Sequence, residues 1–202
     1  MRKVDPERHD EKRRQILQAA ERCFVRGGFR GASTSDICAE AGISPGHLYH
    51  YFESKEAIIA AMTEIGLQKA AARFDGLMQK PDVVAALLAE IDSLRLKQGM
   101  AGSMLHLEVL AEASRNPAIA KILQHRSRRL QQLLASFLRK GQELGQVDPG
   151  LEPDAAAAIV LNVVLGAGSL RVSNPHLDGA SSRAMLKLLI SRFLTPLGMA
   201  ET

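Results

Sequence analysis

GISPGHLYHYFESKEAI, residues 42–58, contains both tyrosines of the chain and two of its six histidines. Ser44 is a good N-cap and Pro45 suits the first position of a helix, so a short helix is expected to begin here. Leu48 and Phe52 lie four residues apart on this helix, and this spacing predicts its buried face. The neighbouring aromatic side chains then project away from the core: His47, Tyr49, His50 and Tyr51.

Two further helices are expected before this one. Residues 10–26 carry an apolar stripe at helical spacing, and the glycine pair that follows can end the helix. A short helix comes next, where Ser33 and Asp36 resemble a capping box. Gly42 then stops this helix just before Ser44. The order of long helix, short helix, tight turn and short helix predicts a helix-turn-helix, whose last helix faces a phosphate-rich groove.

The rest of the chain is also predicted to be helical, because no segment shows a sustained alternation of apolar and polar residues. The expected helices span residues 55–78, 82–97, 102–114, 118–144, 154–172 and 181–194. Proline-containing turns mark the breaks between them, except the break between 97 and 102. The predicted fold class is all-α with about nine helices. It comprises an N-terminal three-helix helix-turn-helix domain, residues 1–54, and a C-terminal helical domain, residues 55–202.

The composition argues against several classes of protein. Hydrophobic residues make up 46% of the 202 residues and charged residues 24%, which is ordinary for a globular chain. The chain has only two cysteines, both in patterns that predict mostly buried helix positions and without metal-ligand spacing. A disulfide scaffold is therefore not expected, and a reducing cytoplasm is favoured. The charged N-terminus does not resemble a signal peptide. The longest apolar run, residues 155–170, is too short and too interrupted to span a membrane comfortably.

An enzyme is not predicted. The sequence has no phosphate-binding loop, no metal-spaced histidine or cysteine cluster and no recognisable nucleophile setting. His106 and Glu108 are two residues apart, and such neighbours do not face each other on a helix. We therefore expect no catalytic residue, no cofactor and no metal. The net charge of +4 permits a nucleic-acid partner but does not demonstrate one.

Residues 15–58 resemble the TetR family of bacterial transcriptional regulators. The segments ILQAAERCFVRGGFRGAST, SDICAEAGIS and PGHLYHYFESKEAI follow one another in the order typical of that family. The matching positions are Gly46, Leu48, Tyr49, Phe52, Lys55 and Glu56. The resemblance implies a DNA-binding domain followed by six helices that bind a ligand and form a dimer.

The resemblance also implies contacts with double-stranded DNA. His47 stands where the family often has threonine or alanine, so it is the candidate for recognising the base sequence of the DNA. Lys55, in the first turn of the next helix, opposes the helix dipole; a DNA phosphate would explain it, and an exposed lysine that tolerates the cost is the alternative. The expected DNA-binding residues are Thr34, Ser35, Pro45, Gly46, His47, Tyr49, His50, Tyr51 and Lys55.

A homodimer through the last two helices is a further implication of the resemblance. Small residues near 155–168 and the apolar stripe at 186–197 suit a four-helix bundle across a two-fold axis, although both stripes could instead pack inside one monomer. No motif places the effector site. The candidates are adaptable apolar side chains and isolated polar ones: Met62, Phe74, Leu88, Met104, His106, Glu108, Asn162 and Ser169.

The predicted function is a ligand-responsive repressor that binds a palindromic operator as a homodimer and is released by a small-molecule effector. The alternatives are an activator and a helical interaction module that does not bind DNA. Cys38 is interpreted as a small core residue in preference to a redox sensor. The run HRSRR, residues 125–129, is predicted to be a solvated face and not an anion site.

Overall fold

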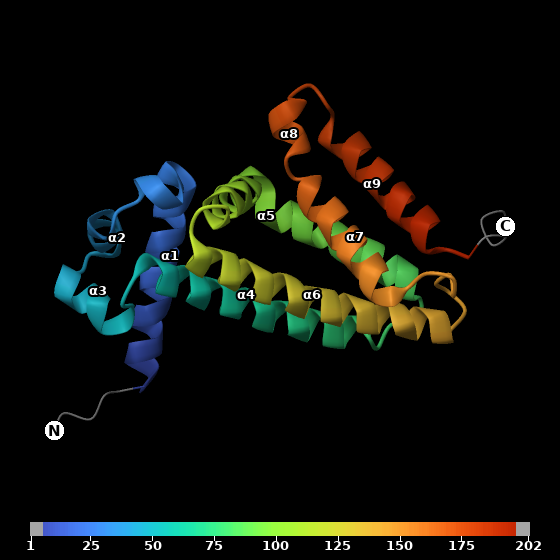
Figure 1. Ribbon diagram of the computed structural model, residues 1–202, viewed down its shortest axis with the longest axis horizontal. Helices are drawn as coiled ribbons and strands as arrows, with labels where there is room; N and C mark the ends of the chain where they lie inside the picture. Colours follow the sequence, from blue (N-terminus) through green and yellow to red (C-terminus); the bar gives the residue numbers. More distant parts are fainter. Residues whose placement is uncertain (1–5, 197–202) are drawn as a thin grey trace. The chain divides into compact units, whose positions relative to one another are not determined.

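The computed structural model describes residues 6–196, except for the side chains of residues 94–104 and 171–172. These residues form nine helices and no strand, which confirms the all-α prediction (Figure 1). The helices are α1 (Pro6–Gly31), α2 (Thr34–Ala41), α3 (Pro45–Tyr51), α4 (Lys55–Leu77), α5 (Val83–Ala113), α6 (Pro117–Glu143), α7 (Pro153–Gly166), α8 (Leu170–Ser173) and α9 (Gly179–Leu194).

Two of the expected breaks between helices differ from the prediction, and α1 extends beyond the expected residues 10–26 at both ends. Helix α5 runs continuously through residues 97–102, where a break was expected. The glycines there cost only about 1 kcal/mol each relative to alanine, and no proline interrupts the helix. Conversely, the single helix expected at 154–172 is divided, because α7 ends at Gly166 and the short α8 begins at Leu170.

The helices group into two compact units. The first takes the chain up to Gly66 together with residues 105–124, and the second takes residues 67–104 together with the chain from His125 onward. Helices α4, α5 and α6 therefore each contribute to both units. The boundary expected between a DNA-binding domain and a C-terminal domain, at residues 54 and 55, stays a prediction.

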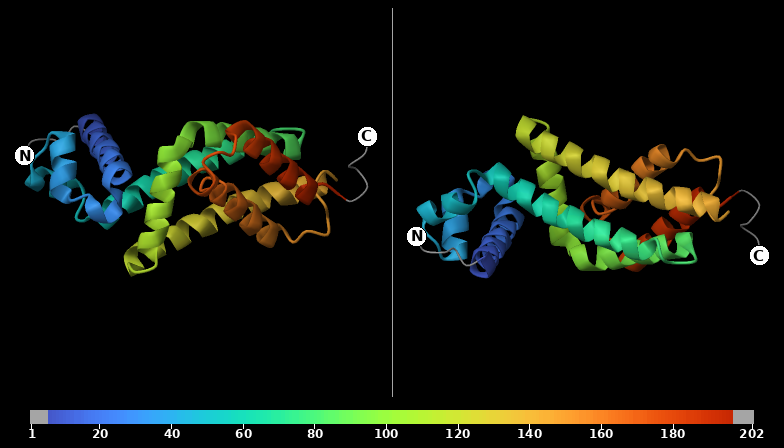
Figure 2. Two further views of the ribbon diagram at one scale, coloured as in Figure 1. Left: turned by 90° about the horizontal axis from the view of Figure 1, so that it is seen from above. Right: turned by 90° about the horizontal axis from the view of Figure 1, so that it is seen from below.

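The core of the first unit joins the three N-terminal helices to parts of α4, α5 and α6. Leu48 and Phe52 are 1% and 5% exposed, so the predicted buried face of α3 is confirmed. Helices α2 and α3 lie beside α1 in both views of Figure 2. The largest buried side chains of this core include Ile16, Phe24, Ile37, Leu48, Ile58 and Ile119.

The second unit has its own core. It is formed by the end of α4, the first half of α5, the second half of α6, and helices α7 and α9. On α9, Leu186, Ile190 and Leu194 are buried, whereas Met185 and Leu189 are 61% and 55% exposed. Helix α9 thus has a second apolar face that the described residues of the chain leave open. No helix in the described ranges is long and apolar enough to cross a membrane.

Candidate nucleic-acid interface

Helix α2 begins with the capping box expected from the sequence. The backbone N–H of Asp36 donates to Ser33 Oγ at 3.1 Å, and the backbone N–H of Ser33 donates to Asp36 Oδ2 at 2.8 Å. Hydrogen bonds from the side chain and backbone of Ser33 lower the pKa of Asp36. This cap fixes the first turn of α2, where Thr34 is half-buried and Ser35 is exposed.

A tight turn connects α2 to α3. Gly42 adopts φ 62° and ψ 43°, a left-handed conformation that glycine tolerates, and its N–H donates to Ala39 O at 3.3 Å. Ser44 then caps α3, because its Oγ accepts a hydrogen bond from the backbone N–H of His47. Pro45 occupies the first turn, as predicted. The helix-turn-helix is confirmed.

The outward face of α3 presents polar aromatic side chains. His47, Tyr49 and His50 are exposed, and Tyr49 is 55% exposed, as predicted. Pro45 and Gly46 are exposed at the start of the same helix. This surface therefore offers hydrogen-bond donors and acceptors beside the N-terminus of a helix, which suits a phosphate-rich groove.

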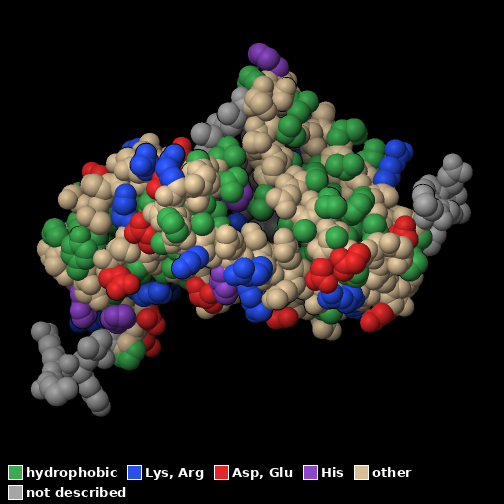
Figure 3. Space-filling model, in the orientation of Figure 1, with side chains coloured by type: hydrophobic (Ala, Val, Ile, Leu, Met, Phe, Trp, Pro, Cys, Tyr) green, Lys and Arg blue, Asp and Glu red, His purple; other side chains and the backbone are tan. Residues whose placement is uncertain are grey.

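Tyr51 differs from its neighbours on α3, because it is half-buried and packs against the first core. The prediction that it points wholly away from the core was wrong. Its ring centroid lies 4.7 Å from that of His9 on α1, 5.5 Å from His47 and 5.3 Å from His50. Figure 3 shows histidine side chains gathered over this part of α1 and α3.

His9 contacts this group of aromatic side chains, which the sequence did not indicate. The expected first helix began at residue 10, whereas α1 begins at Pro6 and places His9 on the turn that faces Tyr51. The composition of this charged N-terminal segment does not indicate the contact. The only available signal was helical spacing, because extending the stripe of α1 backward by two turns reaches His9.

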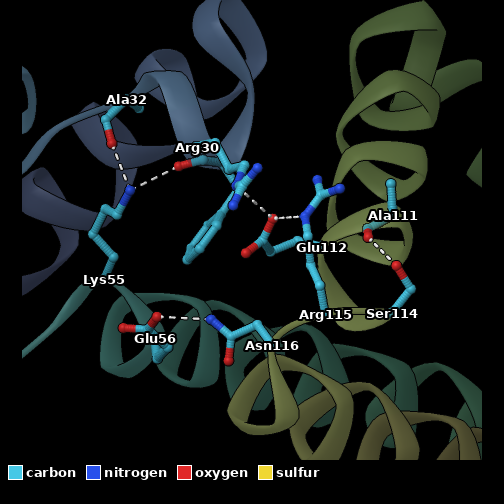
Figure 4. A network of polar contacts seen from close by, with 10 residues as sticks. Arg30, Ala32, Lys55, Glu56, Ala111, Glu112, Ser114, Arg115 and Asn116 are labelled. Carbon is cyan, nitrogen blue, oxygen red and sulfur yellow. Dashed lines mark hydrogen bonds and ion pairs between the residues drawn. The ribbon is translucent and has the colours of Figure 1, made fainter.

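Lys55 has a partner inside the protein. Its Nζ donates to the carbonyl oxygens of Phe29 and Ala32, each at 2.9 Å, and lies 4.6 Å from the centroid of the Phe29 ring (Figure 4). These carbonyls explain why a cation is tolerated in the first turn of α4. Because an ammonium group has three hydrogens, one remains for another acceptor. The DNA contact of Lys55 stays a prediction.

A second group of polar contacts joins α1 and α4 to the α5–α6 corner (Figure 4). Glu112 is only 7% exposed, and its carboxylate lies 3.5 Å from Arg30 and 2.8 Å from Arg115. Asn116 donates to Glu56 Oε1 at 3.0 Å. The pKa of Glu56 is lowered, first by a hydrogen bond from its own backbone N–H. The corner is therefore held against α1 and α4.

The candidate effector residues are divided between the two units. Met62, His106 and Glu108 belong to the first unit, where Met62 packs against the core and Glu108 lies beside Gly28. In the second unit, Phe74 and Leu88 pack against the core, and two polar side chains donate to nearby carbonyls: Asn162 to Ala158 and Ser169 to Gly166. The side chain of Met104 lies outside the described residues. An effector role for this set stays a prediction.

The two cysteines are buried and free. Burial raises the pKa of both thiols, with charged neighbours as smaller influences on Cys23. A thiol that is held protonated is a poor nucleophile, which favours the interpretation of Cys38 as a core residue. In the described ranges, no group of three histidine, cysteine or acidic residues could hold a metal ion.

A capped helix-turn-helix with exposed polar aromatics, placed on an all-α scaffold, defines a helix-turn-helix transcriptional regulator. The chain belongs to the TetR family of bacterial regulatory proteins. The model of that family matches residues 16–62, and a model described as the C-terminal region of BetI-type transcriptional repressors matches residues 95–195. The protein is therefore a regulator and not an enzyme.

Relatives and solved structures agree with this assignment. The chain is 32% identical over 154 residues to the HTH-type transcriptional regulator UidR of Escherichia coli strain K12, covering 76% of this chain and 78% of UidR. It is 27% identical over 150 residues to the transcriptional repressor KstR2 of Mycobacterium tuberculosis H37Rv, covering 72% and 74%. The solved structure of Salmonella enterica GusR superposes with a TM-score of 0.77 at 27% identity, covering 91% and 95%.

Proposed function

We propose that this protein is a ligand-responsive repressor. It binds a palindromic operator in double-stranded DNA as a homodimer, and a small-molecule effector releases it. The observation that carries the proposal is α3, where the buried Leu48 and Phe52 hold the exposed His47, Tyr49 and His50 outward. The effector acts by population shift: it binds preferentially to a conformation in which the separation of the two recognition helices does not match the spacing of the operator half-sites.

The proposed DNA contacts are those of the helix-turn-helix and its flanks. Thr34 and Ser35 meet phosphate or an adjacent base, and Pro45 and Gly46 bring the start of α3 close to the duplex. The remaining contacts are His47, Tyr49, His50, Tyr51 and Lys55. Of these, Tyr51 and Lys55 also serve the fold, so their substitution affects stability as well as binding.

Selection from a randomised duplex library, followed by sequencing of the retained DNA, tests this proposal. Enrichment of an inverted repeat is expected, and its half-site spacing gives the separation of the two recognition helices. Retention of DNA without any preferred sequence, by folded protein at moderate salt, would point instead to an interaction module.

His47 and Tyr49 are expected to differ in their effects on binding. His47→Ala should change the preferred base at one position of each half-site, because a base contact carries about 1–3 kcal/mol of discrimination. Tyr49→Phe should weaken binding to all sequences alike, because a phosphate contact carries no sequence information. Repeating the selection with each variant checks both expectations. An unchanged preferred site for His47→Ala would rule out its reading role.

The proposed homodimer uses the two long C-terminal helices, α7 and α9. Support comes from the uncovered apolar face of α9, which carries Met185, Leu188 and Leu189, and from Ile159 on α7, which is 53% exposed. An exposed apolar group of this kind is typical of a protein interface. A two-fold axis would bring the same surface of a second copy against it.

Leu189→Glu is expected to weaken this dimer, because it places a charge at the centre of the apolar face. Sedimentation velocity at micromolar concentration should show a dimer for the wild type and a predominantly monomeric variant. Leu144→Glu is the matched control, since Leu144 is also about half exposed but lies outside α7 and α9. A wild-type monomer, or a variant that stays dimeric, would contradict the proposed interface.

A further inference from the structure

The basic run at residues 125–129 only partly matches its prediction as a solvated face. His125, Arg128 and Arg129 are exposed, as expected, but Arg126 is half-buried. It falls at helical spacing on the inward stripe of α6. That stripe is otherwise apolar and includes Ile119, Ile122, Leu123, Leu130, Leu133 and Leu134.

Three other cationic side chains of the second unit have acidic partners. Arg139 pairs with Asp154, Arg73 with Glu90, and Lys187 with Asp92. Within the described ranges, no hydrogen bond or ion pair is made by the Arg126 guanidinium. Residues 94–104, whose side chains are not described, contain no aspartate or glutamate.

An unpaired cation in a half-buried position is unfavourable. Burial lowers the pKa of Arg126, yet a guanidinium remains charged in proteins. Removing such a charge from water without a counter-ion costs free energy, so natural proteins usually pair it. A guanidinium presents parallel N–H donors that match the two oxygens of a carboxylate.

We propose that Arg126 anchors the effector and that the effector is an anion, namely a carboxylate attached to an apolar body. The carboxylate binds the guanidinium, and the apolar body lies along the hydrocarbon side chains beside it on α6, among them Leu130 and Leu133. This inference rests on the proposed function, because it specifies the chemistry of the effector.

The test uses full-length protein and two variants. Arg126→Met removes the charge and keeps an apolar stem, and Arg128→Met is the matched control on the exposed side of the same helix. The probes are sodium benzoate and sodium octanoate, each compared with its uncharged counterpart, benzamide or octanol, at constant ionic strength. Urea unfolding without a probe and thermal unfolding with each probe are measured.

We expect Arg126→Met to be at least as stable as the wild type without a probe, because an unpaired charge is gone. At least one of the two carboxylates should stabilise the wild type and Arg128→Met more than its uncharged counterpart does. Its apparent affinity for Arg126→Met should be at least roughly tenfold weaker, because the charge-assisted hydrogen bonds to the guanidinium are lost.

Three results would overturn the inference. One is a marked loss of stability in Arg126→Met without a probe, which would assign Arg126 to the fold. Another is equal stabilisation of the wild type and Arg126→Met, and the third is no carboxylate-specific stabilisation of the wild type. Library selection with Arg126→Met separates this inference from the proposed function. An enriched inverted repeat would support the regulator even where the anion site fails.

Discussion

Gly28→Ala is expected to lower the free energy of unfolding of the first unit by about 2–3 kcal/mol, because the backbone there is available almost only to glycine. Gly28 has φ 68° and ψ 172° within α1, which kinks at this point. An added Cβ would also lie 2.7 Å from Glu108 Oε2, although that flexible side chain can move away. Urea unfolding followed by circular dichroism measures the effect.

Gly31→Ala is the matched control for this substitution. Gly31 belongs to the same helix, its φ is not positive, and an added Cβ would meet no atom within 4 Å. It should change stability by less than about 1 kcal/mol, with stabilisation the more natural outcome. Combining Gly28→Ala with Glu108→Ala separates backbone strain from side-chain crowding. If Gly28→Ala were as harmless as Gly31→Ala, the strain argument would fail.

Lys55→Met is expected to cost about 2 kcal/mol of stability, because two carbonyl oxygens lose a charge-assisted hydrogen bond while the apolar stem is kept. The carbonyls belong to Phe29 and Ala32, at the C-terminal end of α1. Lys69→Met, at an exposed position of α4, should change stability by less than about 0.5 kcal/mol. Urea unfolding of both variants measures the difference.

DNA binding by Lys55→Met distinguishes its two possible roles. If Lys55 contacts a phosphate, the variant should release about one ion fewer per protomer on binding DNA. The slope of the logarithm of the binding constant against the logarithm of the salt concentration should become shallower accordingly. A purely structural role requires weaker binding with an unchanged salt slope. A variant that keeps wild-type stability would contradict the internal role described here.

The helix-turn-helix could be predicted because its signals are local. Ser33 and Asp36 cap one helix, Ser44 and Pro45 begin the next, and Gly42 provides the left-handed turn between them. Each signal lies within a few residues of the backbone groups that it satisfies. The outward direction of His47 and Tyr49 then followed from the helical spacing of the buried residues beside them.

The contacts that were missed join residues far apart in the sequence. Lys55 binds carbonyls 23 and 26 residues earlier, and Glu112 binds Arg30 across a larger separation. Helical periodicity cannot distinguish a phosphate from a backbone carbonyl as the partner of a lysine. For the same reason, the inward position of Arg126 was hidden by the exposed residues around it in a basic run.

Residues 105–124 pack with the N-terminal helices although nearly forty residues of the other unit precede them in the chain. This has a consequence for protein engineering. A chimera that transplants only residues 1–54 onto a foreign sensor would separate Arg30 from Glu112, and the carbonyls of Phe29 and Ala32 from Lys55. A functional graft would have to include the α5–α6 corner together with the helix-turn-helix domain. Otherwise the recipient protein would have to supply the complementary charges of that corner.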